Sequence, residues 1–299
     1  MSTPLLMVVS SLLFALMGVC VKLASSQYAA GEIVFYRSLI GALSIVVVAR
    51  LRGGPSLATP VPAMHFWRSV SGIAALLLWF HSIVGLPLAT AMTLNYMSSV
   101  WMALFLLGGG VLLGAARLDG RLVAAVLAGF AGVALVLRPT VEQQQVWYGL
   151  AGVLSGILAA VAYLQVTALG RAGEPAQRIV FYFCIGGLAV GAASMLWQGS
   201  APHTPRGLVL LLAIGLLAVA GQTMMTAAYR IGRPLVNASL QYLGIAFSFA
   251  FGVLWFDDPI TLSALAGIAL IVGAGLAATL LRSRQQPAAT DPRAPPPES

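Results

Sequence analysis

The sequence predicts an all-α integral membrane protein with ten transmembrane helices arranged as two inverted five-helix repeats. Three observations lead to this fold class: a composition too apolar for water, a series of apolar runs, and an internal repeat. Of the 299 residues, 60% are hydrophobic and 8% are charged, whereas an ordinary soluble domain carries about 25% charged residues. So few charges cannot cover a water-exposed surface, which excludes a soluble enzyme, a nucleic-acid binder and a disordered scaffold.

Glycine, proline and charged residues divide the chain into separate apolar runs. Each run is near the length of about 20 residues that an α-helix needs to cross a bilayer. The first run is not a cleaved signal peptide, because it is too long, lacks a basic stretch before it and is followed by further spans. The predicted spans are residues 4–24, 31–50, 66–85, 88–112, 121–138, 147–169, 177–197, 207–229, 234–255 and 262–281.

The basic residues predict how these helices are oriented. If the N-terminus is cytoplasmic, most of the 16 basic residues lie in cytoplasmic segments, as the positive-inside rule requires. The other side keeps Lys22, Arg138 and Arg206, while Arg37 falls inside the second span. We therefore expect a multi-pass protein of the bacterial inner membrane with both termini cytoplasmic. The cytoplasmic set is Arg50, Arg52, Arg68, Arg117, Arg121, Arg171, Arg178, Arg230, Arg233, Arg282, Arg284 and Arg293.

The net charge of +8 does not indicate a nucleic-acid partner, because the basic residues stand singly or in pairs between apolar runs. Cys20 and Cys184 lie within apolar runs, so they indicate neither a disulfide framework nor a metal site. The expected partners are therefore membrane lipid and a small-molecule substrate, with no cofactor. A monomer is compatible with the sequence.

Two short motifs recur at nearly the same separation. Ile-Val-Phe-Tyr at residues 33–36 recurs at 179–182, and Gly-x-Pro-Leu-x-x-Ala at residues 85–91 recurs at 232–238. Because five spans are an odd number, a second five-helix unit must enter the membrane from the opposite side. Inverted repeats of this kind are typical of secondary transporters, whose site lies near the bilayer midplane between the repeats.

The domain boundaries follow from this repeat. We expect the first five-helix unit at residues 1–145 and the second at residues 146–281. Residues 282–299 are rich in proline, alanine and polar residues, and they cannot bury apolar surface. The sequence predicts that they form a disordered cytoplasmic tail.

These features resemble the drug/metabolite transporter superfamily and, more narrowly, its EamA-type exporters. The resemblance covers about residues 5–281, and the chain is most similar to inner-membrane exporters of amino acids, including the YddG type that exports aromatic ones. It implies export of small amphipathic metabolites by alternating access, with amino acids favoured and a drug or other metabolite as the alternative. Many members carry a proline within helix four, where this chain has Ser98 and Ser99, so the resemblance leaves the bending of that helix open.

Polar and aromatic residues inside the predicted spans mark a candidate cavity, because polar groups at membrane depth face protein or water. Asn237, Gln241, Gly244 and Ser248 share one face of the ninth span. The alternative is ordinary hydrogen bonding between closely packed helices. The candidate substrate-binding residues are Phe14, Met17, Trp79, His81, Asn95, Tyr96, Trp101, Tyr163, Gln222 and Gln241.

Arg37 is the formal charge that the span boundaries place at membrane depth, and two roles are open for it. It either acts at a gate or substrate site, or forms a structural ion pair with Glu32. A membrane-embedded enzyme is the rival class, but the sequence lacks a His-Glu-x-x-His pair, a Gly-x-Ser-x-Gly elbow and an intramembrane aspartate pair. We therefore expect no catalytic residues and no metal ligands. The carboxylates fall in loops and helix ends, which predicts transport without obligatory proton exchange.

Overall fold

The structure is a computed structural model, and the residues that it describes form helices and the loops between them, without a strand among them. It describes residues 2–52, 56–112, 145–231 and 240–285, together with positions 124, 127–128, 131–132, 135 and 237. The helices are α1 (Thr3–Ala24), α2 (Ala30–Arg52), α3 (Pro62–Gly85), α4 (Leu88–Tyr96), α5 (Ser98–Leu112), α7 (Gln145–Arg171), α8 (Ala176–Gln198), α9 (Pro205–Ile231), α11 (Leu243–Phe256) and α12 (Leu262–Gln285).

The prediction of an all-helical, multi-pass membrane protein is confirmed. Within the described part of the chain, six helices are long and apolar enough to cross a membrane: α1, α2, α3, α7, α8 and α9. Most of the predicted fifth span (121–138), the start of the ninth span and the tail after residue 285 lie outside the described residues. The count of ten helices and the boundaries of the two repeats therefore stay predictions.

The span expected over residues 88–112, whose bending the resemblance left open, is interrupted at one residue. α4 ends at Tyr96 and α5 begins at Ser98, with Met97 between them. On both sides of this break, side-chain hydroxyls donate hydrogen bonds to backbone carbonyl oxygens. Such bonds compete with the hydrogen bonds of the helix and often bend it. Thr93 Oγ1 donates to the carbonyl of Ala89 at 2.6 Å, and Ser99 Oγ donates to the carbonyl of Tyr96 at 3.3 Å.

The ninth predicted span has a corresponding break. Gln241 and Tyr242 form a turn before α11 starts at Leu243. The hydroxyl of Tyr242 is hydrogen-bonded to the hydroxyl of Ser99, so the two breaks lie against each other. Discontinuous helices at the centre of a bundle are a feature of transporter substrate sites.

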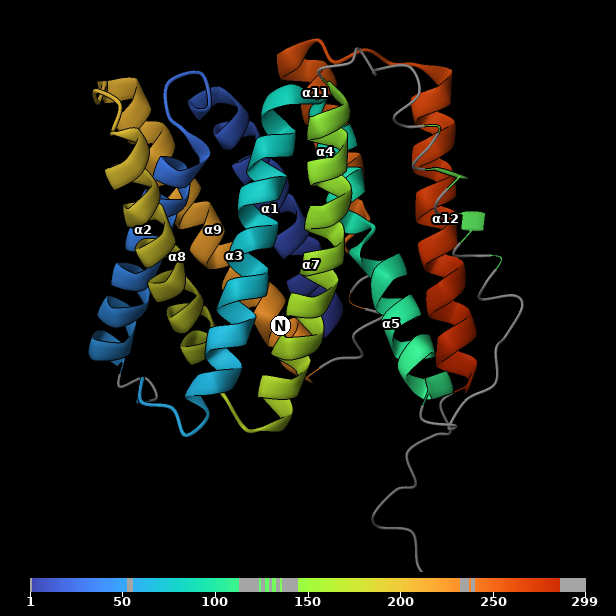
Figure 1. The fold of residues 1–299 in the computed structure, drawn as a ribbon, viewed down its shortest axis with the longest axis horizontal. Coiled ribbons are helices and arrows are strands. Elements are labelled where there is room, and N and C mark those ends of the chain that lie inside the picture. The colour runs from blue at the N-terminus through green and yellow to red at the C-terminus, as the bar shows by residue number, and fades with distance from the viewer. Residues whose placement is uncertain are drawn as a thin grey trace, which may run out of the picture.

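The longer helices pack in pairs that exchange when the two halves of the chain are swapped. By their order in each half, α1 corresponds to α7, α2 to α8 and α3 to α9. α3 packs against α7 and α1 packs against α9, while α2 packs against its own counterpart, α8. α5 and α12 lie together on the side of the bundle away from α2 and α8 (Figure 1).

At the end of the bundle where α1 stops, one carboxylate joins three segments. Nζ of Lys22 lies 3.0 Å from Oδ1 of Asp258, in the connection after α11. The other oxygen of Asp258 accepts a 2.8 Å hydrogen bond from the backbone N–H of Leu88, at the start of α4. The topology expected from the sequence places all three segments on the non-cytoplasmic side.

At the opposite end, the buried carboxylate of Glu174 ties the α2–α3 loop to the α7–α8 loop. Oε2 of Glu174 lies 3.0 Å from Nε2 of His65, and Oε1 accepts 3.0 Å hydrogen bonds from Thr59 and Arg178. Arg178 also donates to the carbonyl of Ser56 at 2.6 Å. Burial raises the pKa of Glu174, but these hydrogen bonds and the charge of Arg178 outweigh burial, so its pKa lies below the ordinary 4.5.

Candidate substrate-binding cavity

A cavity lies between the helices at the centre of the bundle. Helices from both halves of the chain form its walls, and its cavity volume is about 60 Å³. Its lining combines aromatic rings, two amides and two arginines. The lining residues are Phe14, Arg37, Arg68, Gly72, Ala75, Leu76, Trp79, Asn95, Tyr96, Ala159, Ala162, Tyr163, Phe183, Gln222 and Met225.

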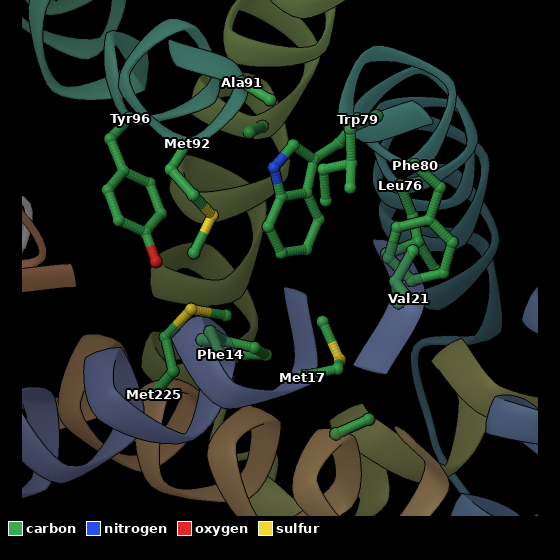
Figure 2. Close-up of a cluster of buried hydrophobic side chains, with 14 of the residues drawn as sticks. Phe14, Met17, Val21, Leu76, Trp79, Phe80, Ala91, Met92, Tyr96 and Met225 are labelled. Carbon is green, nitrogen blue, oxygen red and sulfur yellow. The ribbon is translucent and has the colours of Figure 1, made fainter. Parts of the chain in front are cut away.

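Aromatic side chains from three helices form one part of the wall. Figure 2 shows Trp79 of α3 and Tyr96 of α4 facing α1, where Phe14 and Met17 lie. Tyr163 of α7 stacks on Tyr229 of α9, with ring centroids 4.8 Å apart and an interplanar angle of 13°. Flat aromatic surfaces of this kind suit a ligand with a planar or apolar part.

Tyr163 is held from behind by Tyr229 and Gln241, which lie outside the cavity lining. Tyr229 is fully buried, and its hydroxyl donates to Oε1 of Gln241 at 3.3 Å. Nε2 of Gln241 in turn lies 3.4 Å from the sulfur of Met225. The break before α11 therefore contributes to the cavity indirectly, by fixing the ring on which Tyr163 stacks.

Two buried arginines form the polar part of the wall. Arg37 of α2 and Arg68 of α3 are each 3% exposed, and both guanidinium groups lie over the ring of Phe183, at 5.3 and 4.5 Å from its centroid. A Cβ at Gly72 would lie 1.9 Å from Nη1 of Arg68, so the missing side chain at this position makes room for the guanidinium.

Several hydrogen-bond donors of these arginines are unused by the described part of the protein. Arg37 donates to Oε1 of Gln222 at 3.4 Å. Among the described residues, Nε of Arg37 and both Nε and Nη1 of Arg68 have no hydrogen-bond partner. Buried cations are ordinarily paired, so these free donors mark a place where a ligand could bind.

The structure does not show the ion pair expected between Arg37 and Glu32. An oxygen of Glu32 instead accepts a 3.1 Å hydrogen bond from the backbone N–H of Ala201. The two residues are five positions apart on α2, and 3.6 residues per turn places them on different faces of the helix. No aspartate or glutamate lines the cavity in the described part of the chain.

Six of the ten candidate substrate residues line this cavity, and Arg37 joins them. The six are Phe14, Trp79, Asn95, Tyr96, Tyr163 and Gln222. His81 does not belong to the cavity: it is exposed on the outside of α3, where its ring packs 4.7 Å from that of Tyr148. Since each residue turns a helix by 100°, His81 lies far around α3 from Trp79.

The other three candidates also fall outside the cavity lining. Met17 is fully buried in the apolar cluster next to the cavity (Figure 2). Gln241 lies behind it against Tyr229, and Trp101 lies on α5, beyond the break that the sequence did not reveal.

Sequence reasoning missed Arg68 and Phe183. Arg68 was assigned to the cytoplasmic segments, whereas it is 3% exposed; its neighbour Trp67 is 61% exposed. The available signal was the position of Arg68 inside the third predicted span, one turn before Gly72. A small residue one turn away on the same helix face leaves space for a long side chain to fold inward.

Comparisons with known proteins place the chain among transporters. The sequence model of the EamA-like transporter family matches residues 1–138 and again residues 146–280. Two Pseudomonas aeruginosa proteins, each named a pseudopaline exporter, are 32% and 33% identical to it and align with 90% of this chain and 93% of their own length. An uncharacterized transporter of Helicobacter pylori is 27% identical over 91% of this chain and 92% of its own.

A solved crystal structure also resembles the chain, with a TM-score of 0.67 over 95% of this chain and 99% of its own. Its sequence identity is 22%, so this likeness concerns the fold alone. The exporters named among the relatives are pseudopaline exporters, and they do not support the narrower expectation of a YddG-type exporter of aromatic amino acids.

Proposed function

The chain belongs to the EamA-like transporter family, and from this premise we propose that it exports small amphipathic metabolites from the cytoplasm across a bacterial inner membrane. The central cavity is the transport site. The observation that carries this proposal is a cavity at the middle of the bundle whose aromatic, amide and cationic lining comes from both halves of the chain. A ligand with a planar part and a polar end would find complementary groups there.

Alternating access between the two halves is the mechanism that we propose. The helix pairs exchange under a swap of the halves, which supports two related units that rock about a shared site. Separate contacts join segments at the two ends of the bundle: Lys22 with Asp258 at one end, and Glu174 with His65 at the other. Opening one set at a time would expose the cavity to one side of the membrane.

The substrate class follows from the same lining. Amino acids and compounds built from them carry both a polar end and, in many cases, a planar side chain. Two relatives are named as pseudopaline exporters, which supports export of an amphipathic metabolite in this chain as well. A drug or other metabolite exporter is the second candidate, and the mainly aromatic and aliphatic walls favour it.

The test compares the metabolites released by bacterial cells that express the wild-type chain, Trp79→Ala or Tyr163→Ala. We expect the wild type to enrich one metabolite or a small group in the medium, and both variants to reduce that enrichment at equal protein levels. Trp67→Ala is the matched control, because Trp67 is exposed on the outside of α3. This variant should transport as the wild type does. Enrichment that is unchanged in both cavity variants would contradict the assignment of the site.

A further inference from the structure

We infer that the cavity selects anions: the transported molecule carries a carboxylate or phosphate group that binds between Arg37 and Arg68. This inference rests on the proposed function for its transport meaning, but it concerns binding and can be tested separately. The juxtaposition that carries it is two arginines from different helices, both 3% exposed, whose guanidinium groups both lie over the ring of Phe183.

The first step of the argument is the charge of the site. An arginine side chain stays protonated in proteins, so the cavity contains two positive charges. Removing a charge from water without pairing it is strongly unfavourable. Contact with the face of Phe183 offsets part of this cost, because an aromatic ring attracts cations. It does not neutralise two charges.

The second step is that the described acidic residues are bound elsewhere or lie outside the cavity. Glu32 bonds to the backbone of Ala201, Glu174 to His65 and Arg178, and Asp258 to Lys22. Asp257 lies after α11 and does not line the cavity. Within the described lining, the polar partners are the neutral amides of Asn95 and Gln222 and the hydroxyls of Tyr96 and Tyr163. An anionic ligand would therefore supply the compensating charge.

The third step is geometry. The guanidinium group is a planar fork that binds a carboxylate or phosphate through two parallel hydrogen bonds. Among the residues that the structure describes, Nε on both arginines and Nη1 on Arg68 have no hydrogen-bond partner but are shielded from the cavity in this conformation. A small turn of each guanidinium group would present them to an anion in the cavity that both residues line. Trp79 and Tyr163 line the same cavity and can contact the apolar part of that ligand.

The site therefore discriminates by charge. A cationic amine would meet two like charges without an acidic residue to pair with it. A zwitterionic amino acid would satisfy the arginines with its carboxylate, but its ammonium group would find only neutral acceptors. A molecule with net negative charge and a planar group is favoured over both, which shifts the expected substrate away from simple aromatic amino acids.

The experiment measures ligand-induced thermal stabilisation of the purified full-length protein in detergent at neutral pH. The probes share an aromatic ring and differ in charge: phenylsuccinate, phenyl phosphate, tryptophan and tryptamine. We expect the two anions to stabilise the wild type, tryptophan to act weakly and tryptamine not at all. Removing one charge-assisted partner in Arg68→Gln or Arg37→Gln should weaken anion binding by about tenfold or more.

Arg171→Gln is the control, because Arg171 is exposed at the end of α7 and its loss should leave binding unchanged. If Arg68→Gln does not fold, Arg68→Lys keeps the charge without the fork, and it should bind the anions more weakly while still rejecting tryptamine. Whichever of the two anions stabilises the protein more indicates whether the natural ligand carries a carboxylate or a phosphate ester.

Three results would overturn the inference: no stabilisation by either anion, equal stabilisation by tryptamine, or anion binding that survives both arginine substitutions. Uptake of the bound anion into proteoliposomes separates this inference from the proposed function. Arginine-dependent binding without any movement across the membrane would leave the anion site standing and refute transport. Transport of tryptophan by a protein that binds neither anion would support transport and refute the anion site.

Discussion

Tyr96 fills the space that Gly244 leaves open, so that a Cβ added at Gly244 would lie 2.7 Å from Cε2 of the tyrosine ring. Tyr96 is the last residue of α4, and Gly244 is near the start of α11. The two helix breaks therefore meet, and one of the cavity walls depends on the absence of a side chain on the opposite helix.

Gly244→Ala should destabilise the protein and displace Tyr96 from the cavity wall. Forcing one extra carbon into a packed interior costs about 1–3 kcal/mol. Thermal unfolding in detergent measures this effect. Gly273→Ala is the control, because a Cβ there meets nothing within 4 Å and alanine favours a helix over glycine. Equal stability of the two variants would mean that Tyr96 does not need this space.

The contribution of Glu174 to stability should be lost in acid. Its pKa is lower in the folded protein than the ordinary 4.5, so its interactions stabilise the fold fully above the unfolded pKa. They weaken as pH falls below about 4.5 and disappear as pH passes through the folded pKa. The difference in melting temperature between the wild type and Glu174→Gln should therefore be large at pH 7 and shrink below pH 4.5. A difference that grows in acid would contradict the assignment.

Both termini are predicted to be cytoplasmic. The measurement is labelling of single cysteines at Gly199 and Ser283 by an impermeant reagent, in a background where Cys20 and Cys184 are replaced by alanine. Gly199 follows α8 and should react from outside, whereas Ser283 in α12 should react only after the membrane is opened. Labelling of Ser283 in intact cells would refute the topology and the inverted repeat with it.

Transport should not require exchange with protons. The described cavity lining contains no carboxylate, and His81, which lies within the third predicted span, is exposed on the outside of α3. A substrate should equilibrate across proteoliposome membranes. An imposed pH gradient should not make it accumulate against its own concentration gradient. Accumulation that a protonophore abolishes would contradict this prediction. The same loss in His65→Gln would then assign the proton to the pair formed with Glu174.

The sequence predicted the class of fold and much of the cavity because both depend on local composition. The lengths of the apolar runs predicted the helices. Polar or aromatic character within a span marked Trp79, Tyr163 and Gln222 as cavity residues, and all three line the cavity. The break at Met97 was not predictable in this way, because it depends on hydroxyl contacts to the backbone and on packing against α11.

Arg68 shows the second limit. A basic residue close to the start of a span satisfies the positive-inside rule whether it points to water or to the interior. Only the packing of α3 against α8 places its guanidinium over Phe183 instead of at the surface. His81 shows the converse, since a polar residue in a span lies on the outer face.

The most direct test of alternating access is whether one position in the cavity can be reached from both sides of the membrane. Ala75 lines the cavity near the middle of α3, and Ala75→Cys in the cysteine-free background reports its accessibility to a hydrophilic thiol reagent. Ala189→Cys is the control, because Ala189 is exposed on the outside of α8 and should face lipid. We expect Ala75→Cys to react from either side of sealed vesicles while Ala189→Cys reacts from neither. Reaction of Ala75→Cys from one side alone, under all conditions, would contradict transport through this cavity.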